Sequence, residues 1–244
     1  MAKRPAPRTR LDPAVREKMI LDAAVEFFAE HGFAGQTKEL AARIGVSQGL
    51  IFRYFDTKQT LVERVYERVF LERWSPLWER ELKDRAVAFP ARMERFYRAY
   101  LDAVDAEQWM RVAMFASLAG HDITNRYIQT HIEPVLEIIL KEANAYCGRP
   151  DDGPVGPLDR EHAWHLHSAF IYYLVRKHIH RLPVLEDKAA LVTRLVTAFI
   201  AGYAALPATS PAAEAPGREP APQKSRPRRP VSRKATARKA STGG

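Results

Sequence analysis

The sequence predicts an all-α protein of about nine helices, because three features of its patterning agree. Apolar residues recur at helical spacing through most of the 244 residues. No run alternates apolar and polar residues cleanly enough to indicate a strand. Glycine and proline gather between the periodic runs, most clearly in "CGRPDDGPVGP", which predicts a loop.

The first predicted helix lies in "VREKMILDAAVEFFAEHG". Gly32 suits the position just past its end, where a left-handed residue often stops a helix. Its apolar face at helical spacing contains Ile20, Ala24, Phe27 and Phe28.

Two short helices follow, and a turn separates them. Thr37 is a good N-cap for "KELAARI", Gly45 ends that helix because glycine reaches positive φ at low cost, and Ser47 can cap the next one. Two short helices joined by such a turn form a helix-turn-helix. The apolar side that would hold this pair against the first helix contains Leu40, Ala41, Ile44, Val46, Ile51 and Phe55.

A longer helix is expected after the helix-turn-helix. Asp56 or Thr57 would cap it, and it would run from near Lys58 toward Arg80 with a kink or break at Pro76. The remaining periodic runs predict helices at about 90–106, 107–119, 123–147, 159–181 and 186–206.

The net charge of +9 is concentrated at the two ends of the chain. Residues 1–60 carry +3, residues 61–206 carry −1 and residues 207–244 carry +7, as expected of a chain whose ends meet a polyanion. We predict a flexible basic arm at 1–10, a helix-turn-helix domain at 11–57 and a larger helical domain at 58–206. Residues 207–244 have too few large apolar side chains to fold and are expected to be a disordered basic tail.

Composition also predicts the compartment. No run of 18 apolar residues indicates a membrane span, and no apolar segment follows the basic N-terminus as in a secretory signal. The single cysteine, Cys147, cannot form an internal disulfide, which is consistent with a reducing cytoplasm. We therefore expect a cytoplasmic protein without a membrane partner.

The outer side of the third helix predicts contact with DNA. A short helix with an exposed N-terminal half fits the major groove, and glutamine and arginine carry the donors that read purine edges. By itself a helix-turn-helix is a weak motif, because many helical proteins contain such a corner.

A longer segment carries a more specific signal. "ILDAAVEFFAEHGFAGQTKELAARIGVSQGLIFRYFDTKQTLVERVYERV", from Ile20 to Val69, resembles the DNA-binding domain of the TetR (tetracycline repressor) family, also called TetR/AcrR. The matching features are "AA..FF...HGF", Thr37 before "K-x-L-A", "GVSQG", "FRYF" and the "TK" that opens the next helix. Beyond this segment the likeness is one of architecture.

The resemblance implies a function. It implies a homodimeric transcription regulator that binds a palindromic double-stranded DNA operator, with a C-terminal domain for ligand binding and dimerisation. Such a protein is usually a repressor released by a small-molecule effector, with no cofactor and no catalytic residues. The residues alone do not distinguish repression from activation, and they do not identify the effector.

The resemblance also implies positions that contact DNA. Thr37 and Lys38 would reach phosphate or base edges, and Lys58 would bind a phosphate near the start of the fourth helix. Phe52 stands where the family usually has tyrosine; it cannot donate to a phosphate, so we expect it to contact a thymine methyl or only the backbone. The groove would be lined by Gln48, Gly49, Leu50, Arg53 and Tyr54.

Two segments rich in aromatic residues and methionine, "EQWMRVAMFASLAGHD" and "HSAFIYYLVRKH", are candidate pocket walls. In the family such faces surround a ligand, although aromatic stripes are more often plain core. Pro134 would kink the helix at 123–147, which can open a cavity or only shape the bundle. The candidate ligand residues are Trp109, Met110, Met114, Phe115, His131, Phe170 and Tyr173.

The last two predicted helices offer wide apolar faces. Ala198, Ala201 and Gly202 permit close helix approach, so two such helices from each protomer could form a four-helix interface. On the first of these helices His162 and His165 are spaced so that they could share a metal, but packing or interface roles are more common for such histidines. We predict no metal site.

Two other classes of function remain as alternatives. For an enzyme, the sequence has no nucleophile elbow, no phosphate-binding glycine loop and no metal-binding motif, although folding could assemble a catalytic pair from scattered Asp, Glu and His. The other class is a helical adaptor whose basic tail binds nucleic acid or acidic proteins. A gel shift with the DNA upstream of its own gene would distinguish a regulator from an enzyme.

The tail generates a first prediction. Residues 218–239 hold nine basic side chains and one acidic, which suit either a solubilising tail or attachment to DNA flanking the operator. Each neutralised phosphate contributes about −0.9 to the slope of log K against log salt. If half of these charges engage, deletion of residues 207–244 should reduce the magnitude of that slope by several units and leave base preference unchanged. Equal slopes for both forms, on operator and scrambled duplex, would show that the tail does not touch DNA.

Overall fold

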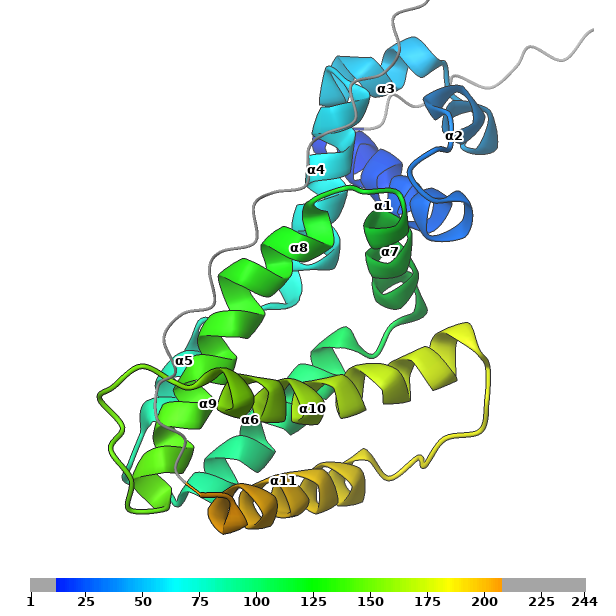
Figure 1. Cartoon of the computed structure of the whole chain (residues 1–244). Coiled ribbons are helices and arrows are strands. Elements are labelled where there is room, and N and C mark those ends of the chain that lie inside the picture. The colour runs from blue at the N-terminus through cyan, green and yellow to red at the C-terminus, as the bar shows by residue number, and fades with distance from the viewer. Residues whose placement is uncertain (1–11, 208–244) are drawn as a thin grey trace, which may run out of the picture. The chain divides into compact units, whose positions relative to one another are not determined.

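The structure, a computed structural model, describes residues 12–207, and its regular elements there are all helical, which confirms the predicted all-α fold (Figure 1). The predicted basic arm, and the predicted tail beyond Pro207, lie outside the described residues. In chain order the elements are α1 (Pro13–His31), α2 (Thr37–Arg43), α3 (Gln48–Phe55), α4 (Lys58–Val69), the 3-10 turn η1 (Leu71–Arg73), α5 (Leu77–Lys83), α6 (Phe89–Val104), α7 (Glu107–Leu118), α8 (Ile123–Tyr127), the π-helical η2 (Ile128–Ile132), α9 (Glu133–Tyr146), α10 (Pro157–Leu174), the π-helical η3 (Val175–Ile179) and α11 (Lys188–Ala205).

The helix-turn-helix forms from local signals. Gly32 stops α1 at a φ of 67°, and Gly45 makes the turn between α2 and α3 at the same φ. Ser47 caps α3, where its hydroxyl oxygen accepts from the amide of Leu50 at 3.2 Å. The N-cap of α2 is Gln36 and not Thr37, because a capping box with the side chain at position 39 starts the helix one residue earlier.

The helix after the helix-turn-helix is shorter than predicted. Thr57 caps α4, but the helix ends at Val69 and does not continue toward Arg80. A 3-10 turn and an extended Trp74 follow, and Pro76 is the N-cap of α5. Proline cannot donate the next helical hydrogen bond and disfavours helical backbone in the residue before it, so a new helix begins here.

The predicted helix at 123–147 is interrupted before Pro134. The chain passes from α8 through the π-helical η2 into α9, with Pro134 in the first turn of α9. The proline has no N–H to give, and its ring would collide with the carbonyl four residues earlier in a regular α-helix. The π segment therefore lies where the proline forbids ordinary helix.

The C-terminal helices pack around α6. Its Tyr97 stacks on Phe170 of α10 with ring centroids 4.4 Å apart, and its Arg92 donates to Glu142 of α9 at 2.7 Å. The helix α11 packs on α6 and α10. These contacts make α6 the central element of this half of the described chain.

One side of α11 is bare within the chain. Among the described residues, α11 is the helix long and apolar enough to cross a bilayer by length and composition, but only 22% of it is buried. A core helix would be mostly buried, whereas most of α11 is not covered by the rest of the described chain. Length and composition alone are weak evidence for a membrane span.

Lys58 joins the start of α4 to the loop between α1 and α2. Its ammonium donates to the carbonyl of Phe33 at 2.7 Å and to that of Gly35 at 2.8 Å. These bonds set the position of α4 against the helix-turn-helix, and α4 in turn packs on α1 and α3.

The change Lys58→Met should lower the free energy of unfolding by roughly 1–3 kcal/mol, because two carbonyls lose their charged donor. Thermal and urea unfolding measure it. The neighbouring Gln59, which is exposed, supplies the control: Gln59→Met should stay within about 0.5 kcal/mol of the parent. Equal stability of the two variants would contradict a structural role for the lysine.

Candidate nucleic-acid interface and apolar pocket

The third helix presents one side to solvent and buries the other. Ile51 and Phe55, one turn apart, are buried against the rest of the helix-turn-helix. Gly49 and Arg53 lie on the opposite side and are exposed, and Gln48 is exposed at the start of the helix. A helix fixed by one face with polar groups on the other has the form that enters a major groove.

Arg53 and Lys38 are the available cations on this surface. Both are exposed, and neither makes an ion pair or hydrogen bond with another described residue. Arg43, by contrast, is held by Glu30, with Nη2 2.8 Å from Oε1, and the same contact raises the pKa of the arginine. A phosphate or a guanine edge would therefore meet two cations that no internal partner competes for.

Thr37 lies in a different position from the one expected of a DNA contact. Its side chain is buried, and its hydroxyl oxygen accepts from Nε2 of Gln48 at 2.7 Å. The bond fixes the amide of Gln48 at the start of α3 and leaves its oxygen and second N–H free. Thr37 thus acts on the exposed surface through Gln48.

The other expected contacts are partly occupied. Leu50, Phe52 and Tyr54 are half-buried, and Tyr54 packs against the core. Lys58 is half-buried and already gives two hydrogen bonds, so one of its three N–H groups is left for a phosphate.

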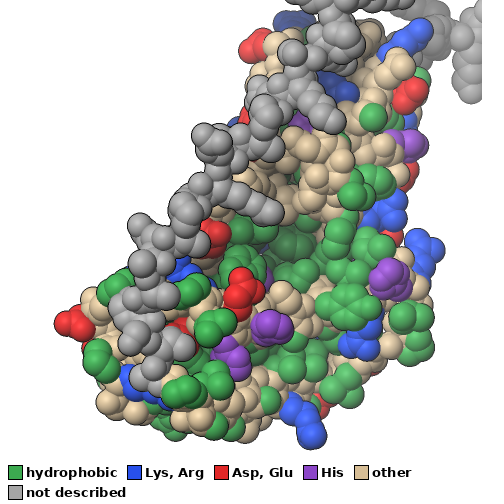
Figure 2. Space-filling view, in the orientation of Figure 1, with side chains coloured by type: hydrophobic (Ala, Val, Ile, Leu, Met, Phe, Trp, Pro, Cys, Tyr) green, Lys and Arg blue, Asp and Glu red, His purple; other side chains and the backbone are tan. Residues whose placement is uncertain are grey.

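A pocket of about 340 Å³ lies among α6, α7, α8 and α10. Figure 2 shows hydrophobic side chains gathered around a hollow on this face, between α7, α8 and α10 as drawn in Figure 1. Of the seven residues expected to bind a ligand, Trp109, Met110 and Met114 line the pocket.

The other four expected residues lie elsewhere. Phe115 covers the end of α1, where a Cβ on Gly32 would lie 3.1 Å from its ring. The ring of His131 packs at a tilt of 34° against Trp74, and Phe170 stacks on Tyr97. The Tyr173 hydroxyl donates to the carbonyl of Leu185 at 2.9 Å. Aromatic composition indicated helices that border the pocket but not which of their faces line it.

Sequence reasoning missed several wall residues, including Tyr100, Tyr127 and His167. His167 is buried, and burial lowers the pKa of its imidazole to about 4. It is therefore neutral near pH 7. The sequence signal that could have identified it is its spacing from Trp164 and Ile171 on α10. Residues about one helical turn apart share a face, and all three line the pocket.

The histidine cluster on α10 disperses in the structure. His162 stacks on Phe199 of α11 at 5.0 Å, and His165 is exposed and hydrogen-bonds its own helix. In the part of the chain that the structure describes, no three His, Cys, Asp or Glu side chains are placed to hold a metal ion. His178 pairs with Asp105 at 2.7 Å instead.

Comparison with known proteins bears on the N-terminal half. Residues 20–65 match the family model "Bacterial regulatory proteins, tetR family". A helix-turn-helix transcriptional repressor of Mycobacterium tuberculosis is 42% identical over 73 residues, which are 28% of this chain and 39% of that protein. The regulator LuxR of Vibrio harveyi is 39% identical over 70 residues, which are 28% of this chain and 33% of LuxR. The chain thus matches well under half of the length of these relatives.

Solved structures resemble the chain over most of its length. A TetR-like regulator from Rhodococcus sp. RHA1 has a TM-score of 0.60 and 21% identity, covering 79% of this chain and all of that one. A tetR-family regulator from Streptomyces coelicolor has a TM-score of 0.51 and 20% identity, covering 80% and 84%. At this identity the likeness concerns the fold.

The change Arg53→Ala tests the exposed face of α3. It should weaken binding to a selected DNA site and relax preference at one base pair per half-site, because a bidentate arginine–guanine pair contributes roughly 1–3 kcal/mol of discrimination. Arg80→Ala removes an exposed arginine from α5 and should leave preference unchanged. Competition binding on single-base variants of the site measures both. Unchanged preference in Arg53→Ala would reassign this side chain to phosphate contact.

Proposed function

We propose that this chain, a TetR-family protein by its N-terminal domain and its fold, is a sequence-specific DNA-binding transcription regulator. The observation that carries the proposal is the exposed side of α3, where Arg53 has no internal partner and Gln48 is held in one orientation. The family is one of regulators and not of enzymes. We expect repression and not activation, because the M. tuberculosis relative that matches the DNA-binding segment is a repressor.

The regulator acts as a homodimer. Ala198 and Ala201 are exposed on α11, and Leu185 and Tyr172 nearby are more than half exposed, so apolar surface is open along α10 and α11. Gly202 faces inward, where a Cβ would touch His162 at 3.7 Å, and so belongs to the chain's own packing. A second copy covering this face by two-fold symmetry would bury it and pair two reading helices.

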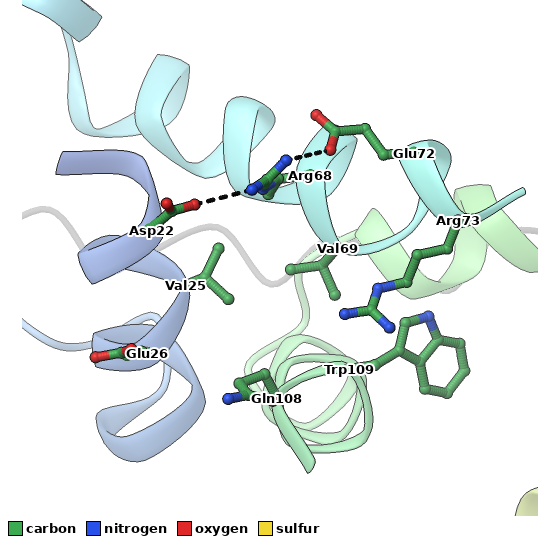
Figure 3. A pocket seen from close by; sticks show the side chains of 9 residues that line it. All are labelled: Asp22, Val25, Glu26, Arg68, Val69, Glu72, Arg73, Gln108 and Trp109. Atoms are coloured by element: carbon green, nitrogen blue, oxygen red, sulfur yellow. Dashed lines mark hydrogen bonds and ion pairs between the residues drawn. The ribbon is translucent and has the colours of Figure 1, made fainter. Parts of the chain in front are cut away.

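A small-molecule effector bound in the apolar pocket releases the DNA. Trp109 lines this pocket and also the cleft of about 410 Å³ between α1, α4 and α7 in Figure 3. In that cleft Arg68 of α4 bonds Asp22 of α1 at 3.1 Å, and Glu72 at 2.6 Å. A ligand that shifts Trp109 would therefore disturb the packing of α4 against α1.

The effector need not touch the reading helix. Arg126 of α8 pairs with Glu63 of α4 at 2.7 Å and lies over the ring of Tyr66, and Arg111 of α7 donates to the carbonyl of Ala29 at the end of α1. A ligand that favours another arrangement of α7 and α8 thus selects dimers in which the two α3 helices no longer fit successive major grooves.

Selection of bound duplexes from a random pool tests the proposed function. We predict a palindromic or near-palindromic site with half-sites about one helical turn apart or somewhat more. Ala198→Glu, which puts a charge on the bare face of α11, should give a monomer with little affinity for that site. Ala91→Glu, on the exposed first turn of α6, is the matched control and should remain dimeric. A parent chain that sediments as a stable monomer at micromolar concentration, or a pool without enrichment, would contradict the proposal.

A further inference from the structure

The apolar pocket has no charged side chain in its wall. Its sixteen lining residues are aromatic, aliphatic or neutral polar, and its one titratable imidazole, His167, is neutral near pH 7 because burial lowers its pKa to about 4. A carboxylate, phosphate or ammonium entering this space would lose its water without meeting a countercharge. Such an uncompensated transfer costs several kcal/mol.

Some polar groups in the wall already have partners and others do not. The hydroxyls of Ser117 and Thr124 both donate to the carbonyl of Ala113, at 2.9 and 3.0 Å. The buried hydroxyl of Tyr100 and the buried indole N–H of Trp109 have no hydrogen-bond partner among the described residues. His167 makes ring contacts with Tyr100 and Trp164 but no hydrogen bond to another described residue. A neutral imidazole carries one donor and one acceptor, so His167 can fix the orientation of a ligand, beside the hydroxyl of Tyr100 and the N–H of Trp109.

The shape of the pocket limits the ligand further. A volume of about 340 Å³ is at the small end for ligand sites, which suits a compound of about 10 to 20 non-hydrogen atoms. The rings of Tyr100, Trp109 and Trp164 offer flat surfaces. Both π-helical segments border the space, through Ile128 and Ile132 of η2 and Val175 of η3, and π segments recur at functional sites.

We infer that the pocket binds an uncharged, mainly aromatic compound that carries one group able to hydrogen-bond His167, and that it rejects organic anions and cations of the same size. The inference rests on the proposed function for its biological meaning, because this ligand would be the effector. The binding itself follows from the wall and is measurable without DNA.

Two fluorescent probes with the same ring skeleton test the predicted preference for neutral over charged ligands. N-Phenyl-1-naphthylamine is neutral, and 8-anilino-1-naphthalenesulfonate adds one sulfonate. Titration of the full-length protein should show the neutral probe saturating at one per chain, and binding at least about tenfold tighter than the anion. Equal or tighter binding of the anion at the same site would overturn the inference.

A charge placed in the wall should reverse this preference. Met114→Lys keeps the length of the side chain and adds a cation, so the affinity ratio of anion to neutral probe should rise at least about tenfold. Met19→Lys, half-buried on α1 away from the pocket, is the matched control and should leave the ratio unchanged. The same rise in both variants would show that the probes bind elsewhere, and would overturn the inference.

Paired histidine variants test the hydrogen bond. His167→Phe should weaken the neutral probe several-fold, whereas His165→Phe, exposed on the same helix, should not. Unchanged binding in His167→Phe would overturn the role of His167. Operator binding is measured separately with the same proteins. If the neutral probe binds more tightly than the anion but the protein stays on DNA, the ligand class is supported and release of DNA by the ligand is contradicted. If the neutral probe does not bind but DNA binding is intact, the inference about the pocket is overturned and the proposed DNA-binding function is not.

Discussion

The packing of Phe70 between Trp109 and Tyr127 is the constraint on which the two halves of the described chain depend. Phe70 is fully buried just past the end of α4, and its ring centroid lies 5.4 Å from Trp109 and 5.1 Å from Tyr127. Both partners also line the apolar pocket. Because protein interiors are packed as densely as organic crystals, a displacement of these rings away from the pocket presses on the buried ring of Phe70. Movement of the pocket wall in that direction therefore reaches α4, which packs on α1 and α3.

Asp105 is a second fixed point, between η3 and the start of α11. It accepts hydrogen bonds from Lys177 and His178 of η3 and from Lys188 at the start of α11. Burial opposes its ionisation, but these three bonds outweigh burial and lower its pKa from 3.8 to about 2. Its stabilising contribution is therefore complete above about pH 4 and is lost only as the pH falls toward 2. One carboxylate thus ties η3, whose Val175 borders the pocket, to the helix proposed for dimerisation.

Sequence alone predicted what depends on neighbours in the chain. The helix-turn-helix follows from a glycine that must adopt positive φ at position 45 and a serine that caps at position 47, and both signals are local. The end of α4 at Val69 and the walls of the pocket depend on contacts between distant segments, such as those of Phe70 with Trp109 and Tyr127. The same limit explains why Phe115 and Phe170, predicted to bind a ligand, do not line this pocket, because apolar character does not distinguish a pocket wall from ordinary core.

A resemblance transfers positions but not the state of each side chain. Thr37 and Lys58 are bound internally before any DNA arrives, whereas Arg53 and Lys38 are not, so the two pairs contribute differently. In the proposed function, the first pair would remove the cost of ordering Gln48 and α4 at the moment of binding, and the second would supply new charged contacts. In the proposed function, an effector that loosens α4 would restore that ordering cost. Linkage would then require DNA to weaken effector binding by the same factor, so the pocket and the reading helix would oppose each other without sharing a residue.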